Sequence, residues 1–201
     1  LYNPNKVTVL LDSHVAMKEL CNDGWVTCSP WCKLFKRDVI SDIRFPEGHI
    51  YEDMAIVYKW IFNASNIVVG DQALYYYVQR SGSTTTSEFD LRRMDAVQYV
   101  EQMCSDIVCR YPDLHDIAQK RLFIEYAYLL RSISLATVQT DVMKHYADTL
   151  YQKIKITRKT AWKQGLTLKQ KYYAISSAFG CKAMQYALCI EAFIYKQVKL
   201  R

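Results

Sequence analysis

The stretch that decides the fold reads RFPEGHIYEDMAIVYKWIFNA, residues 44–64. Pro46 and Gly48 mark a loop, because both residue types interrupt regular structure. After this loop, apolar side chains recur at positions 54, 56, 57, 60 and 61, the spacing of one face of an α-helix. The stretch therefore predicts a loop followed by an amphipathic helix over residues 52–64, with an acidic pair in its first positions.

Working outward, the first 89 residues mix helical and extended patterns. Residues 9–21 have helical periodicity, and Asp12 or Ser13 could cap that helix. Residues 25–36 are typical of extended chain with a short strand at 33–35, and residues 37–42 of one or two helical turns. Residues 67–69 and 73–78 are rich in β-branched and aromatic side chains and predict two short strands, followed by a polar loop at 80–88.

The second part has a different character. Residues 90–110, 115–138, 141–156 and 167–199 all predict helices, which Pro112 and Gly165 separate and Gly180 could interrupt. We expect an α+β, predominantly helical chain. Residues 1–89 would form a part with few short strands and an open sheet edge, which could pair with a second copy in a homodimer. Residues 90–201 would form a bundle of four to six helices.

Charge is distributed unevenly along the 201 residues. Residues 151–201 carry eleven Lys or Arg and one acid, Glu191, a net charge of +10, whereas the first 150 residues have a net charge of −4. Such a basic segment fits an anionic membrane surface, a lipid-linked phosphate or a nucleic acid, or it is a solvated helix face. The 16 tyrosines either pack at the edge of the core or form a surface on which sugars stack.

Targeting and redox signals are few. The seven cysteines and four histidines lack zinc-ligand or disulfide spacing, which favours free thiols in a reducing cytosol over a metal or redox protein. No signal peptide and no membrane-spanning stretch is recognised. We expect a cytoplasmic protein, peripheral at the inner face of the membrane if the basic segment binds lipid. The first residue, Leu1, fits a piece of a longer protein.

Three groups of residues could carry chemistry. Glu52 and Asp53 at a helix start either cap the helix or supply a general base facing a cleft. The loop that begins at Arg80 and includes Ser83 could hold a diphosphate or be a polar connection. Either Trp31 is a core residue and Lys33 a surface residue, or both line a cleft. Spacing alone does not decide between these alternatives.

The order of these pieces is more specific than any one of them. WCKLFKR (31–37), RFPEG (44–48), YEDM (51–54), YYY (75–77) and RSGS (80–83) follow one another as in the second half of family 2 glycosyltransferases. Those proteins have W-x-K-L-[FY]-[KR], r-F-x-x-G, E-D, l-Y-Y-Y and R-x-G-S in the same order. The resemblance covers about residues 10–95.

The resemblance implies the C-terminal, acceptor-side part of a GT-A domain at 1–89, with 90–201 as a helical C-terminal domain. It implies an inverting transfer from a nucleotide-diphosphate sugar to a glycan or lipid-linked acceptor, in bacterial cell-surface polysaccharide synthesis. Asp53 matches the general base, and Glu52 would orient the acceptor or the base. Arg80 and Ser83 match the loop that contacts the leaving diphosphate, Lys33 would serve the donor, and Trp31 would line the acceptor cleft.

One departure from the family pattern is large. The family's D-x-D motif, which holds a divalent metal (Mg or Mn) against the diphosphate, has no counterpart, since no Asp-x-Asp occurs in the sequence. The metal is expected in the full-length enzyme and not in this chain, which we expect to be inactive alone.

The main alternative is a non-enzymatic basic helical module that binds an anionic membrane or a nucleic acid. Aromatic residues among lysines in 151–201 support it. A nucleic-acid partner is disfavoured because the sequence has no helix-turn-helix, RNP or zinc pattern. Residues 181–195 place their apolar side chains largely on one side, which fits either a buried bundle helix or an interfacial helix.

Overall fold

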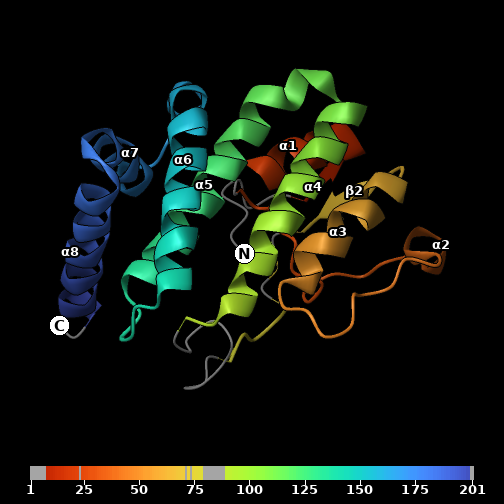
Figure 1. Ribbon diagram of the computed structural model, residues 1–201. Coiled ribbons are helices and arrows are strands. Elements are labelled where there is room, and N and C mark those ends of the chain that lie inside the picture. Colours follow the sequence, from red (N-terminus) through yellow and green to blue (C-terminus); the bar gives the residue numbers. More distant parts are fainter. Residues whose placement is uncertain (1–7, 23, 71, 73, 79–88, 200–201) are drawn as a thin grey trace.

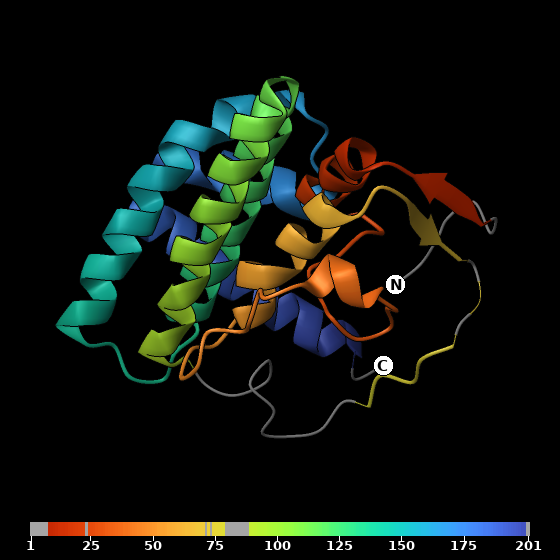
Figure 2. The same ribbon diagram turned by 90° about the vertical axis from the view of Figure 1, so that its right-hand side faces the viewer.

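The computed structural model describes residues 8–22, 24–70, 72, 74–78 and 89–199. The fold is predominantly helical, with one small two-stranded sheet (Figure 1). Helices α4, α5 and α6 lie side by side, and the sheet lies at the opposite end of the molecule from α8 (Figures 1 and 2).

The sheet joins two segments far apart in the sequence. Strand β1 (Val9–Leu11) pairs antiparallel with β2 (Ile67–Val69), with Val9 opposite Val69 and Leu11 opposite Ile67. The helix predicted over 9–21 therefore begins later than expected, and α1 spans Ser13–Cys21. Asp12 sets this start, because its carboxylate accepts a hydrogen bond from the Val15 N–H at 2.8 Å.

Two predicted strands are absent from the described residues. Residues 33–35 and 74–78 form no strand. The tyrosine segment is held by side chains instead, because Trp31 stacks between Tyr75 and Tyr77, with ring centroids 5.2 and 5.0 Å apart. Residues alternating along an extended chain point the same way, so two tyrosines can contact one ring without a hydrogen-bonded ladder. The predictions for α2 (Arg37–Ile40) and α3 (Glu52–Asn63) are confirmed.

The second part is a run of helices. They are η1 (Leu91–Met94), α4 (Asp95–Arg110), η2 (Pro112–Leu114), α5 (His115–Ser134), α6 (Asp141–Lys163), α7 (Leu168–Ser176), η3 (Ser177–Phe179) and α8 (Cys181–Lys199). Gly165 and Gly180 have φ of 74° and 107°, a region that favours glycine, and they end α6 and η3. Helix α6 extends beyond the predicted residue 156, because buried Thr157 and Ala161 continue its inward face.

The buried side chains form one core that includes residues before and after position 89. The Tyr58 hydroxyl of α3 donates to Asp106 of α4 at 2.6 Å, and Lys120 of α5 donates to Asn22 at 2.6 Å. Side chains before and after residue 89 thus pack in the same core. The predicted division into two domains at residue 89 stays a prediction. Within the described residues, no helix is long and apolar enough to cross a bilayer.

Candidate functional site

The predicted acidic pair lies in the first turn of α3, directly after a backbone outlier. Tyr51 caps this helix in the left-handed conformation, with φ of 60° and ψ of 27°. This conformation is uncommon for a bulky residue and costs about 1–3 kcal/mol, so the surrounding structure must hold it in place. Such strained residues cluster at functional sites, which makes Glu52 and Asp53 candidates for more than helix capping.

The carboxylate of Asp53 is half-buried. Burial raises its pKa above the usual value, and the charge of Glu52 acts in the same direction. A hydrogen bond from the Met54 N–H to Asp53 Oδ1, 2.7 Å long, and the charge of Lys33 oppose this rise in pKa. A carboxylate with a raised pKa is a stronger proton acceptor than one in water, which suits a general base.

Lys33 and Trp31 belong to the loop that precedes α2. Cys32 between them has φ of 59°, a second left-handed non-glycine residue. The Lys33 ammonium donates to the Ser29 carbonyl at 2.6 Å and to the Thr27 hydroxyl at 3.3 Å, which fixes the loop. Burial lowers the pKa of Lys33, while nearby Cys28, Cys32 and Asp53 raise it. The structure therefore places the Lys33 charge near Asp53, and Trp31 in the tyrosine stack.

Three charged residues in the same region were not predicted from the sequence. Arg93 of η1 and Glu125 of α5 are only 7% and 8% exposed, and Arg121 pairs with Glu125 at 3.0 Å. Two of these charges act on the phenol of Tyr51. Burial raises the pKa of this phenol, Arg93 lowers it by charge and hydrogen bonding, and Glu125 raises it. The sequence held one local signal, an Arg and a Glu four residues apart on the same helix.

Arg121, Glu125 and Asp53 also act on Cys28. Burial raises the pKa of this thiol to about 12, Arg121 lowers it, and Asp53 and Glu125 raise it. Residues from the 25–36 loop, α3, η1 and α5 thus form one electrostatic neighbourhood around Tyr51 and Asp53. A thiol with this pKa stays protonated at neutral pH, so Cys28 is not a nucleophile here.

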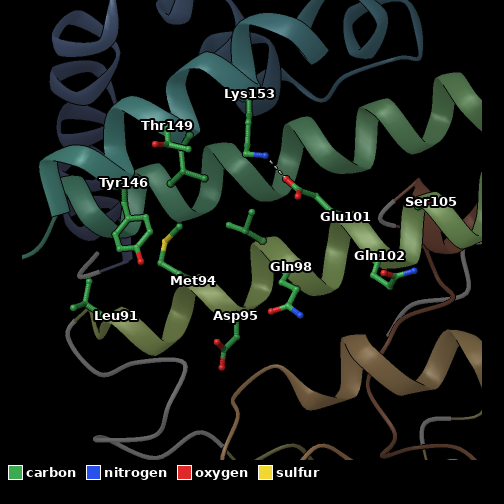
Figure 3. A pocket seen from close by; sticks show the side chains of 12 residues that line it. Leu91, Met94, Asp95, Gln98, Glu101, Gln102, Ser105, Tyr146, Thr149 and Lys153 are labelled. Atoms are coloured by element: carbon green, nitrogen blue, oxygen red, sulfur yellow. Dashed lines mark hydrogen bonds and ion pairs between the residues drawn. The ribbon is translucent and has the colours of Figure 1, made fainter. Parts of the chain in front are cut away.

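A groove of about 640 Å³ lies between α4 and α6 (Figure 3). Its wall carries carboxylate, amide, hydroxyl and phenol groups, including Asp95, Gln98 and Tyr146. Asp95 links it to the loop that precedes α3, because its Oδ2 accepts hydrogen bonds from His49 Nδ1 at 3.1 Å and from the Ile50 N–H at 3.3 Å. Glu52 and Asp53 do not line the groove themselves.

The remaining predicted site residues are not placed. Arg80 and Ser83 lie outside the described residues. Among the residues that are described, no cluster of three His, Cys, Asp or Glu side chains could hold a metal ion. The described part of the site therefore offers a half-buried carboxylate, a nearby ammonium group and an aromatic stack, and no metal-binding set.

The raised pKa of Asp53 predicts a pH-dependent effect on stability. Because the folded carboxyl holds its proton to a higher pH than the unfolded one, ionisation favours unfolding as pH rises above the unfolded pKa of about 3.9. Asp53→Asn removes this penalty, so the melting temperature of the variant relative to wild type should increase between about pH 3 and neutral pH. Thermal unfolding followed by circular dichroism across this range checks it.

Asp90→Asn is the matched control, because Arg92 holds the pKa of Asp90 below its usual value and the sign reverses. Its melting temperature relative to wild type should fall as pH rises. A flat or falling difference for Asp53→Asn would contradict the assignment of a raised pKa.

One comparison with known proteins gives a relative. A stretch of 80 residues, 39% of this chain, is 35% identical to "Glycosyltransferase GlyG" of Streptococcus pneumoniae serotype 4. The match covers 27% of that protein, so the chain spans about a quarter of the relative it matches. No family model matches the chain, and no solved structure matches it. Part of the chain is thus similar to a glycosyltransferase, which supports a transferase at a coarse level.

Proposed function

We propose that this chain is the acceptor-side part of an inverting glycosyltransferase with a GT-A-like domain, and that Asp53 is its general base. The observation that carries the proposal is the environment of Asp53: a half-buried carboxylate with a raised pKa at a helix start that a left-handed Tyr51 positions. The similarity to a glycosyltransferase and the order of the five motifs support the same reaction class.

In the proposed reaction, Asp53 removes the proton from an acceptor hydroxyl. The oxygen attacks the anomeric carbon of the donor sugar as the bond from that carbon to the diphosphate breaks, and a nucleoside diphosphate leaves. Attack from the face opposite the leaving group inverts the configuration. The proton ends on Asp53 and the electron pair of the broken bond on the diphosphate.

The other predicted residues take supporting roles. Glu52 orients the acceptor or the base, and Trp31 lines the acceptor side. The ammonium of Lys33 and the loop of Arg80 and Ser83 stabilise the negative charge that develops on the diphosphate. The acceptor is a glycan or a lipid-linked sugar of cell-surface polysaccharide synthesis.

A divalent cation is a usual partner of this reaction class, but the described residues do not fit one. No step of the proposal depends on a metal. If a metal takes part, its ligands come from residues outside those described here, and it would supply charge stabilisation for the diphosphate.

A transfer assay tests the proposal. The longest natural polypeptide that contains this chain is incubated with a panel of nucleotide-diphosphate sugars and acceptors, and NMR determines the anomeric configuration of the product. We expect a product of configuration opposite to that of the donor, and no transfer by the 201-residue chain alone. A retained configuration, or no transfer with any donor, would contradict the proposed reaction. Efficient transfer by the isolated chain would contradict its being an incomplete catalytic unit.

A further inference from the structure

Helices α7 and α8 expose an unusual set of large apolar side chains at the end of the helical row farthest from the sheet (Figure 1). We call it the α7–α8 apolar surface; its members are Leu168, Tyr172, Ile175, Phe179, Tyr186, Ile190, Phe193 and Ile194. Phe179 is 75% exposed and Phe193 65% exposed. Single exposed apolar residues are normal, but a group of this size on adjacent elements marks an interaction surface.

The spacing of these residues shows that they form stripes. Leu168, Tyr172, Ile175 and Phe179 recur at intervals of four, three and four, which is one face of α7 and its continuation in η3. On α8, Met184 and Leu188 are completely buried, while Tyr186, Ile190 and Phe193 lie on the opposite side. Helix α8 is therefore apolar on two faces. One face is buried in the bundle, as in the first alternative predicted from the sequence, and the other face is exposed, as the interfacial alternative requires.

A hydrogen bond joins the two stripes. The Tyr172 hydroxyl donates to the Ala187 carbonyl of α8 at 3.0 Å. Ala187 lies one turn from Ile190 and two turns from Ile194 on the same helix, so the α7 stripe continues into the α8 stripe. Helix α8 is anchored on its inner side, where Glu191 pairs with Arg131 of α5 at 2.6 Å. This ion pair holds α8 against α5, so the opposite, exposed face of α8 has a fixed position on the molecule.

Most of the charges around this surface are positive, and the nearby acids are Glu191 on α8 and Asp148 of α6, which acts on Cys181 at the start of α8. Exposed Lys169, Lys182 and Lys196 lie on the same two helices. Glu191, the single acid between residues 151 and 201, forms ion pairs with Arg131 and, at 3.3 Å, with Lys169. Large apolar side chains flanked by lysines have the composition of a helix that lies in a lipid interface.

We propose that the α7–α8 apolar surface docks this chain onto an anionic lipid bilayer. The apolar side chains enter the boundary between headgroups and acyl chains, and the lysines remain level with lipid phosphates, where each contributes to binding. Charge complementarity favours lipid over a second copy, because two copies docked through this surface would bring the exposed lysines of α7 and α8 together. The proposal is independent of the transfer reaction.

Vesicle flotation of the 201-residue chain tests it. The chain should float with vesicles of phosphatidylglycerol and phosphatidylcholine at low salt, and much less with phosphatidylcholine alone or at high salt. Phe193→Ser combined with Ile194→Ser should lower the partition coefficient about tenfold or more. Lys182→Gln combined with Lys196→Gln should lower it severalfold and flatten the salt dependence.

The control is Val138→Ser combined with Val142→Ser, which removes two exposed apolar side chains at the α5–α6 turn and should leave flotation unchanged. Circular dichroism establishes that every variant is folded. The proposal is overturned if the wild type does not float with anionic vesicles, or if Phe193→Ser/Ile194→Ser floats equally well. A surface that instead holds two copies together would show as a dimer that these serines dissociate, without vesicle binding.

Discussion

Asp53→Asn is expected to lower the rate of sugar transfer by about 10²–10⁴-fold, the usual contribution of a general base. Asparagine keeps the shape of the side chain and can still accept the hydrogen bond from the Met54 N–H, so the start of α3 should remain intact. It cannot accept a proton from the acceptor hydroxyl. The affinity for the nucleotide sugar should change little, because this carboxylate is proposed to act on the acceptor.

The experiment measures kcat/KM in the longest natural polypeptide that carries this chain, and donor affinity by calorimetry. Glu52→Gln is the matched control: it removes one negative charge at the preceding residue, and its loss of activity should be much smaller. Wild-type activity should also fall as pH drops through the raised pKa of Asp53, because a protonated carboxyl is no base. If Asp53→Asn kept nearly full activity, or lost donor affinity in proportion to its rate, another residue would be the base.

The acidic pair was predictable because its signals are local. Pro46 and Gly48, the helical spacing after residue 52 and the acids at the helix start all lie within about 20 residues of one another. The left-handed Tyr51 was not predictable, because nothing in its neighbours requires that conformation. Its phenol interacts with Arg93, and the charge of Glu125 reaches it from a helix more than 70 residues later. Only the tertiary fold brings these groups together.

The error at 74–78 has a physical cause. Aromatic and β-branched residues favour strands only where a partner strand pairs with them. Here β1 pairs with β2, and the tyrosine segment packs its rings on Trp31 instead. Helix α8 shows a related limit: periodicity counts apolar residues on a face, but it does not report whether the face meets protein, lipid or water.

The loop that carries Trp31 and Lys33 packs against helix α4, so a change in α4 should lower the stability of both parts of the chain. Met103 of α4 is completely buried, and its sulfur lies 3.8 Å from the Cys28 thiol in the loop that also carries Trp31 and Lys33. Met103→Ala leaves a cavity at this junction and should cost about 2–5 kcal/mol of unfolding free energy. Because the core includes residues on both sides of position 89, we expect residues 1–89 and 90–201 to unfold in one transition.

A Trp162→Phe background makes this measurable, because tryptophan fluorescence then reports on Trp25, Trp31 and Trp60 only, while far-ultraviolet circular dichroism reports mainly on the helices after residue 89. In urea, both signals should move to the same lower midpoint in Met103→Ala. Met184→Ala makes the same deletion at a buried position of α8, and it too should shift the fluorescence midpoint. Met184→Ala could instead move the circular dichroism transition and leave the fluorescence transition in place. Residues 90–201 would then be an independent domain, and only contacts within the first 89 residues would hold Glu52 and Asp53 in position.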